Sequence, residues 1–245
     1  RATMNLLPRR AVIVVFLVFA FAYFFSALLR AITATLAPVL TAEFGLNARD
    51  LGLLAGGYFL GFAATQLPMG AWLDHHGPKK VILSLLSVGV VGCLAFSMAT
   101  GFSGLLAARV LIGAGVSACL MAPLTGNRRW LDASTQLRAN SWMLMTGSMG
   151  MVASTLPVQW LMPIVGWRPL FWGLAALVVL SMRLIAVMVP GWKPAAVPVA
   201  SRHVTAPVGT PHPPPVVPAS YAEVWRHPYF RCMVPIGFFS YGGLI

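Results

Sequence analysis

Long apolar runs separated by short polar gaps dominate the chain, and this pattern predicts helices that cross a membrane. A bilayer core about 30 Å thick requires about 20 apolar residues of helix, because a helix satisfies its own backbone polar groups in hydrocarbon. Six runs meet that length, and a seventh begins near Met233 and stops with the sequence at Ile245. The six predicted spans cover residues 11–40, 51–73, 81–99, 102–124, 140–162 and 167–189.

The same pattern predicts three parts. Residues 1–189 would form an all-α membrane bundle of six helices, and residues 233–245 would begin a truncated seventh helix. Between them, residues 190–232 read as an extended cytoplasmic linker, because residues 190–220 contain nine of the chain's 19 prolines and such a run cannot form helix. We therefore expect a partner for this bundle, namely a missing carboxyl-terminal half that the seventh helix would begin.

Composition excludes an ordinary soluble enzyme. Only 9% of the residues are charged, against roughly a quarter in a soluble domain. The net charge of +12 would suggest nucleic acid in a soluble protein, but here the basic residues lie in the gaps between apolar runs, so we expect the lipid bilayer and no nucleic acid as the partner. No catalytic motif, cofactor site or metal site is expected, and His75 and His76 read as loop residues.

The basic gaps also predict an orientation, because Lys and Arg accumulate in cytoplasmic loops. The gaps assigned to the opposite side hold only Arg49, which Glu43 and Asp50 offset, and Arg168. The amino terminus and the linker are thus expected on the cytoplasmic side of the plasma (inner) membrane. The residues that carry this prediction are Arg1, Arg9, Arg10, Lys79, Lys80, Arg128, Arg129, Arg138, Lys193, Arg202, Arg226 and Arg231.

A weak internal repeat links the two halves of the predicted bundle. Residues 61–68 and 150–157 share Gly, Ala, Leu and Pro at the same places, with an offset of 89. The first and fourth spans are expected to finish at Ala37-Pro38 and Ala122-Pro123, with an offset of 85. Three is an odd number of crossings, so the pattern predicts two inverted three-helix repeats, an arrangement found in transporters.

The gap after the second span carries a distinctive loop, Gly70-Ala-Trp-Leu-Asp74-His-His-Gly77-Pro-Lys79-Lys80. It resembles the G-x-x-x-D-x-x-G-x-[RK]-[RK] signature of the major facilitator superfamily, although His75 stands where the family usually has a base. Two further stretches, Arg109-Val-Leu-Ile-Gly113-Ala-Gly115 and Gly166-Trp-Arg-Pro169, also resemble that family in the fourth and sixth spans.

The resemblance implies a secondary active transporter with about twelve spans that works by rocking two bundles about a central site. It also implies that the loop forms an inner gate, made of Gly70, Asp74, Gly77, Lys79 and Lys80. Glycines in the fourth and fifth spans are expected to pack helices closely, namely Gly113, Gly115, Gly147 and Gly150. The antiporter pattern of the fifth span is absent, because no proline follows Gly150 until Pro157; this disfavours drug/proton exchange.

Charges inside the predicted spans indicate the substrate site, because an ionisable group there needs a partner or a wet cavity. The two clear cases are Arg30 and Arg109, each about 10 to 12 Å from the outer end of its helix. No Asp or Glu lies in the six spans, so the site is expected to take a small organic or inorganic anion. The predicted substrate-binding residues are Tyr23, Arg30, Tyr58, Gln66 and Arg109.

Other interpretations stay open at this point. Each hydroxyl of the polar stripe Tyr23, Ser26 and Thr33 could bond to its own helix backbone, and Arg30 could form a structural pair or extend to the outer interface. The chain could also be a truncated fragment without transport activity, or a membrane receptor or scaffold that binds ligand without moving it.

Overall fold

The computed structural model describes residues 9–131, 133–189 and 191, and every described element is a helix. The predicted linker lies outside the described residues except for Gly191, and the predicted seventh helix lies wholly outside them. The described helices are α1 (Arg9–Phe44), α2 (Ala48–Ser97), α3 (Phe102–Val116), α4 (Ala118–Trp130), α5 (Ala133–Ala153), α6 (Leu156–Val165) and α7 (Trp167–Met188).

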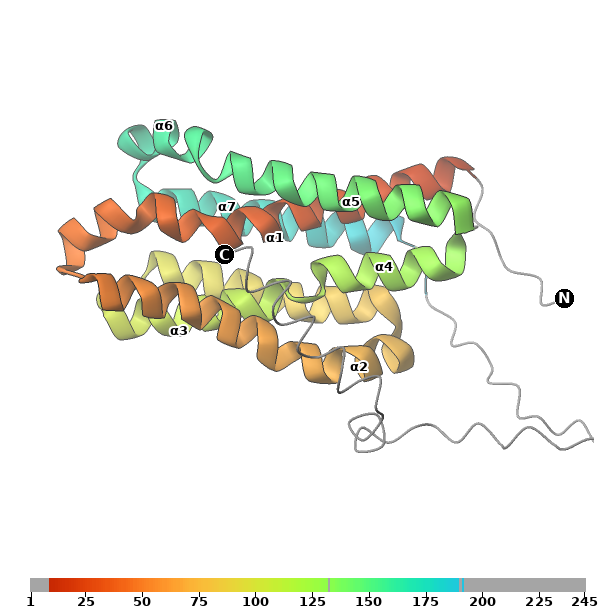
Figure 1. The fold of residues 1–245 in the computed structure, drawn as a ribbon, viewed down its shortest axis with the longest axis horizontal. Coiled ribbons are helices and arrows are strands. Elements are labelled where there is room, and N and C mark those ends of the chain that lie inside the picture. Colours follow the sequence, from red (N-terminus) through yellow and green to blue (C-terminus); the bar gives the residue numbers. More distant parts are fainter. Residues whose placement is uncertain (1–8, 132, 190, 192–245) are drawn as a thin grey trace, which may run out of the picture. The chain divides into compact units, whose positions relative to one another are not determined.

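Helix α2 is not one straight rod. Its 50 residues would extend about 75 Å, well beyond a bilayer core of about 30 Å. Gly77 has φ 77° and ψ 163°, a conformation outside the helix that glycine adopts without a steric penalty. Pro78 follows directly and cannot donate a helical hydrogen bond. Figure 1 shows the ribbon reversing there, so the first and second halves of α2 run in opposite directions.

The chain changes direction at two ends of the bundle (Figure 1). One end holds the start of α1, the Gly77 reversal, the connection from α4 to α5 and the end of α7. Lys79 confirms this placement, because its Nζ donates a hydrogen bond of 2.8 Å to the carbonyl of Val189 after α7. We call this the Lys79 end. The opposite end, with the end of α1 and the start of α7, is the Glu43 end.

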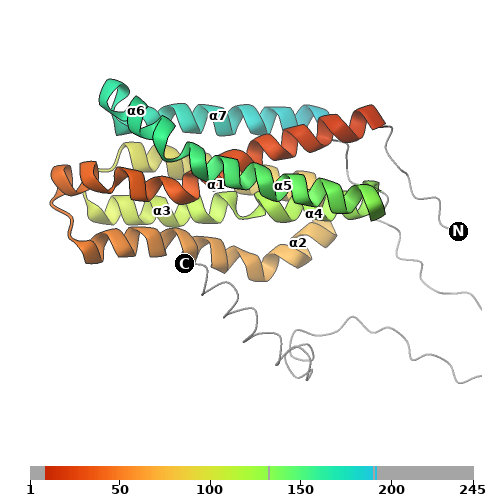
Figure 2. The ribbon, with the colours of Figure 1, turned by 45° about the horizontal axis from the view of Figure 1, so that its top comes forward.

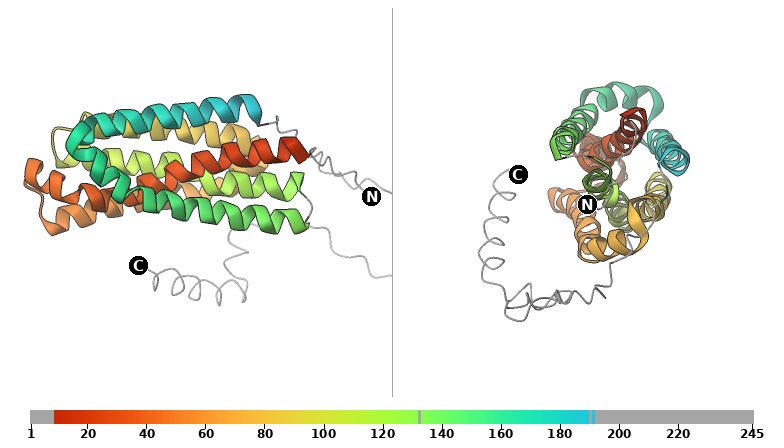
Figure 3. Two further views of the ribbon diagram at one scale, coloured as in Figure 1. Left: turned by 90° about the horizontal axis from the view of Figure 1, so that it is seen from above. Right: turned by 90° about the vertical axis from the view of Figure 1, so that its right-hand side faces the viewer.

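The helices lie alongside one another between these ends (Figure 2). Helix α1 packs against both α5 and α7, and α3 packs mainly against α2. Seen end-on, α7 and the second half of α2 lie on one side of the bundle, and α5 and the first half of α2 lie on the other (Figure 3). The two sides therefore present different surfaces, and each is considered separately below.

Glycines bring α2 and α3 into direct backbone contact. A Cβ added to Gly61 would fall on the carbonyl oxygen of Val110, and one added to Gly113 would fall on the carbonyl oxygen of Tyr58. A Cβ on Gly115 would likewise meet the backbone nitrogen of Gly89 in the second half of α2. Small residues at such crossings let membrane helices approach closely, and this contact fixes Tyr58 and Arg109 relative to each other.

The described helices confirm the prediction of an all-α membrane protein, but they do not establish the predicted number of six spans. Four of them are long and apolar enough to cross a membrane, or up to five if the bent pair α5 and α6 counts as one span. The 42° bend lies at Ser154 and Thr155, where Pro157 in the first turn of α6 has no backbone N–H to continue the hydrogen bonding of α5.

The predicted stops at Ala-Pro were wrong. Helix α1 continues through Pro38 to Phe44, and α4 continues through Pro123 to Trp130. A proline removes one helical hydrogen bond, and within a packed membrane helix neighbouring groups compensate for that loss. The break in the fourth predicted span lies instead at Ser117, between α3 and α4.

Candidate functional site

The polar centre of the described bundle is the contact of Arg109 on α3 with α1. The Arg109 side chain is 1% exposed, and its Nη1 donates a hydrogen bond of 2.9 Å to the carbonyl of Leu29. Its Nη2 donates a second, longer one of 3.5 Å to the carbonyl of Arg30. The guanidinium also lies over the ring of Tyr58, 5.1 Å from the centroid. Arg109 therefore joins α1, α2 and α3 at one point.

Arg30 lies in the same cluster but is held differently. Its guanidinium is 5.7 Å from the ring centroid of Phe62 on α2, and its side chain is only partly buried. Tyr58, fully buried, interacts electrostatically with both Arg30 and Arg109. The structure thus brings together three of the five predicted substrate residues. Phe62 was not predicted, because an aromatic residue on an apolar helix carries no signal of a cation contact.

Four buried polar atoms of this cluster lack a hydrogen bond of regular geometry. They are Nε of Arg30, Nε of Arg109, Oη of Tyr58 and Oγ1 of Thr33, which lies one turn from Arg30 on α1. Buried polar groups in native proteins are almost always paired, so such a group requires an explanation. All four atoms can donate a hydrogen bond. The cluster is therefore rich in unused donors.

The structure places the other two predicted substrate residues elsewhere. The ring of Tyr23 lies against α5, where a Cβ on Gly147 would come within 2.5 Å of its Cε1. Gln66 donates a hydrogen bond of 3.5 Å from Nε2 to the carbonyl of Ser117, at the break between α3 and α4. Spacing along a helix identifies a shared face, but it does not identify which helix that face meets.

The sequence left open whether each hydroxyl group bonds to its own helix or faces another group, and the structure shows both arrangements. Thr65 on α2 bonds to its own helix, with Oγ1 at 2.8 Å from the carbonyl of Phe62. Ser26 instead donates across to α3, 3.4 Å from the carbonyl of Val116. Thr33, as described above, has no such partner. Only Thr33 among these three can therefore add a donor to the Arg30 cluster.

The predicted gate residues lie together at the Lys79 end. Gly77 makes the reversal of α2, and Asp74, Gly70 and Lys80 are exposed around it. Lys79 bonds to the carbonyl of Val189. The predicted packing glycines Gly147 and Gly150 are buried on α5, and a Cβ on Gly150 would fall on the carbonyl oxygen of Phe24 on α1.

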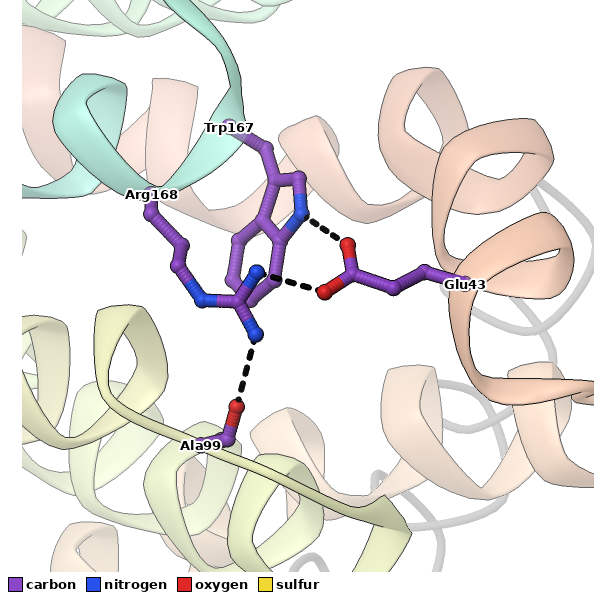
Figure 4. A network of polar contacts seen from close by, with 4 residues as sticks. All are labelled: Glu43, Ala99, Trp167 and Arg168. Carbon is purple, nitrogen blue, oxygen red and sulfur yellow. Dashed lines mark hydrogen bonds and ion pairs between the residues drawn. The ribbon is translucent and has the colours of Figure 1, made fainter.

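At the Glu43 end a polar network holds three chain segments together (Figure 4). Glu43 at the end of α1 accepts hydrogen bonds from Nε1 of Trp167 at 2.6 Å and from Nη1 of Arg168 at 2.5 Å. Arg168 also donates to the carbonyl of Ala99, between α2 and α3, at 3.2 Å. Glu43 thus forms an ion pair with Arg168. Asp50 instead closes the capping box of α2 with Asn47.

The count of two arginines inside the predicted spans was incomplete. Arg183 also lies inside the sixth predicted span, on α7, with its side chain exposed, and Arg168 is the second residue of that span. Among the residues that the structure describes, no group of three His, Cys, Asp or Glu side chains could hold a metal ion.

Comparison with known proteins places the chain in a group of transporters. The family model described as Major Facilitator Superfamily matches residues 19–245. Over 144 residues the chain is 27% identical to "Probable anion transporter 1, chloroplastic" of Oryza sativa subsp. japonica, covering 56% of this chain and 26% of the relative. Over 154 residues it is 26% identical to "Probable sulfoacetate transporter SauU" of Cupriavidus necator, covering 61% and 35%.

A third relative is the "Hexuronate transporter" of Escherichia coli, 25% identical over 144 residues, which covers 59% of this chain and 33% of the relative. The matched segments thus span about a third or less of the length of these three relatives.

Proposed function

Because the chain belongs to the Major Facilitator Superfamily, we propose that it forms the amino-terminal bundle of a secondary active transporter for a small organic or inorganic anion. In this proposal the anion binds between two bundles that rock about it, and Arg30 and its neighbours supply the half of the site that this chain contributes. The names of the three relatives, which refer to an anion, sulfoacetate and hexuronate, support the substrate class.

The observation that carries the proposal is the set of four unused donors around Arg30. A ligand that satisfies them must bring hydrogen-bond acceptors. None of the chain's five acidic residues lies within a predicted span, so the two guanidinium groups of the cluster have no counter-charge from these helices. Guanidinium and carboxylate or phosphate groups match in geometry and charge. An anion therefore fits both the charge and the donors of the cluster.

The two arginines have different roles in this proposal. Both terminal nitrogens of Arg109 donate hydrogen bonds to carbonyl groups of α1, so Arg109 positions the site and holds α1 against α3. Arg30 is less constrained, because its guanidinium contacts the ring of Phe62 and the side chain of Tyr58 and its Nε has no hydrogen-bond partner. We assign the direct substrate contact to Arg30, with Tyr58 beside it. Tyr23 and Gln66 are assigned no direct contact, because they meet Gly147 on α5 and the carbonyl of Ser117.

Six spans remain the best account of the bundle. The reversal at Gly77 turns α2 into two spans, α3 continues into α4, and α5 with α6 supplies one bent span. The inverted three-helix repeat follows from that count as a proposal. The loop around Asp74, exposed at the Lys79 end, would contact the second bundle as the inner gate when the site opens outward.

The orientation can be tested by labelling introduced thiols with a membrane-impermeant maleimide in cells, in a chain with Cys232→Ser. Cys93 and Cys119 are fully buried, so we expect neither to react with the maleimide. We expect Arg49→Cys to label in intact cells, and Lys80→Cys and Arg138→Cys to label only after permeabilisation, because the basic end faces the cytoplasm. Labelling of Lys80→Cys and Arg138→Cys from opposite sides would refute the bundle.

Uptake by proteoliposomes tests the function itself. The complete transporter, in which this chain is joined to a second bundle, is reconstituted and given radiolabelled glucuronate or sulfoacetate, with protein-free liposomes as the control and this chain alone in parallel. We expect saturable uptake of at least one anion and none of labelled glucose. If the anions bind but no uptake is measured, the chain behaves as the transport-inactive fragment that its sequence also allowed.

A further inference from the structure

The outer surface between α7 and the second half of α2 contains an elongated groove of about 400 Å³. It follows the two helices for about 10 Å, since its lining advances seven residues along α2. Its apolar lining consists of Leu83, Val90, Val179, Met182 and Ala186. Two polar side chains complete it, Ser87 and Arg183. An apolar groove that runs along two membrane helices can hold a hydrocarbon chain against its surface.

Arg183 is the charged group of this groove, and it has no partner among the described residues. Ser87, the other polar group, already donates at 2.6 Å to the carbonyl of Ser84 in its own helix. Of the acidic residues that the structure describes, Glu43 pairs with Arg168 at the far end, Asp50 caps α2, and Asp74 makes no ion pair with Arg183. The guanidinium is exposed on the groove rim.

The depth of Arg183 places it near one membrane surface. It precedes Met188, the last residue of α7, by five residues, which is about 8 Å along the helix. That distance is within reach of a long side chain that extends to the headgroup layer. This is the Lys79 end, where Lys79 and Val189 meet. The groove runs from there toward the middle of the bundle, because Val179 and Val90 lie deeper.

We propose that this groove is a binding site for an anionic phospholipid, with one acyl chain along the apolar lining and the phosphate on Arg183. Guanidinium binds phosphate through two parallel hydrogen bonds, and basic pockets between membrane helices hold anionic headgroups. The site lies on the side of the bundle opposite α5 and the first half of α2 (Figure 3). It is therefore separate from the Arg30 cluster and does not depend on the transport proposal.

Native mass spectrometry of the full chain tests this site. The purified protein, in an uncharged detergent, is titrated with phosphatidylglycerol or with phosphatidylcholine of the same acyl chains, and bound lipids are counted. We expect the wild type to bind the first phosphatidylglycerol at least tenfold more tightly than phosphatidylcholine. Arg183→Gln should remove that preference, and Arg10→Gln, the same change at an exposed position at the same end, should retain it within twofold.

A second variant distinguishes the contribution of the apolar groove from that of the charge on Arg183. Ala186→Trp fills the groove but leaves Arg183 in place, so it should weaken binding of both lipids at least fivefold. The proposal is overturned if Arg183→Gln keeps the preference for phosphatidylglycerol. It is also overturned if soluble glycerol phosphate displaces the lipid as well as phosphatidylglycerol does. A third contrary result is that the wild type forms dimers, and that Ala186→Trp removes them without changing lipid binding, because a second copy would then occupy the groove.

Discussion

Replacing Arg30 by Ala weakens anion binding by about 30- to 900-fold, the equivalent of about 2 to 4 kcal/mol for a desolvated charge pair that loses one partner. The large effect is expected because the guanidinium is the partly buried cation of the cluster and its Nε has no other partner. Calorimetric titration of the purified chain with glucuronate and sulfoacetate measures the loss. The anion affinity of Arg30→Lys should lie between those of the wild type and Arg30→Ala, because an ammonium group keeps the charge but lacks the planar pair of donors of a guanidinium.

Arg138→Ala is the matched control, because Arg138 is an exposed arginine of α5 away from the cluster. Its anion affinity should equal that of the wild type. Unchanged affinity in Arg30→Ala would refute the assignment of the substrate contact to Arg30.

The assigned roles also predict a different failure for Arg109→Ala. That change leaves the carbonyl of Leu29 without its donor and removes the group beneath the Tyr58 ring. Arg109→Ala should therefore lower the thermal midpoint of the protein before any ligand is added, whereas Arg30→Ala should leave that midpoint close to the wild type. Equal midpoints for the two variants would contradict the division into a positioning and a binding arginine.

Replacing Gly113 by Ala destabilises the bundle by about 3 kcal/mol or more, which is at the upper end of what overpacking causes. The added Cβ would fall on the carbonyl oxygen of Tyr58 in α2, and backbone cannot give way there unless α2 and α3 separate. Separation would also move the Tyr58 ring from Arg109 and disturb the donor cluster. We expect a marked fall in the thermal midpoint and in the yield of monodisperse protein.

Gly56→Ala in α2 is the control for that prediction. A Cβ at Gly56 meets nothing within 4 Å, and alanine favours helix over glycine by about 1 kcal/mol. Its thermal midpoint should equal or exceed that of the wild type. If Gly113→Ala behaved like Gly56→Ala, the backbone contact between α2 and α3 would be wrong.

The apolar runs predicted most of the helical segments, because membrane helices must be long and apolar regardless of their neighbours. Helix ends were less predictable. Pro38 and Pro123 looked like stops, but a proline costs one hydrogen bond and a packed helix can continue through it. Ser117 interrupts α3 and α4 without a glycine or proline of its own, so composition offered no signal there.

The candidate site was partly predictable for a related reason. Equal depths of Arg30 and Arg109 in their helices indicated that both could reach one region, and the structure brings them together. The carbonyl groups that accept from Arg109 were not predictable, because every residue has a carbonyl. Only the rotation of α1 about its axis places that of Leu29 toward Arg109. Tyr23 shares the face of Arg30 by spacing, yet its neighbour is Gly147 on α5.

Ligand-induced thermal stabilisation, compared between charged and uncharged ligands of similar size, tests the anion site itself. A ligand that binds only the folded protein raises its stability with concentration. We expect glucuronate or sulfoacetate to raise the thermal midpoint of the wild-type chain, and glucose and choline to leave it unchanged. The anion effect should vanish in Arg30→Ala. Equal stabilisation by glucose or choline, or an anion effect that survives in Arg30→Ala, would contradict the proposed function.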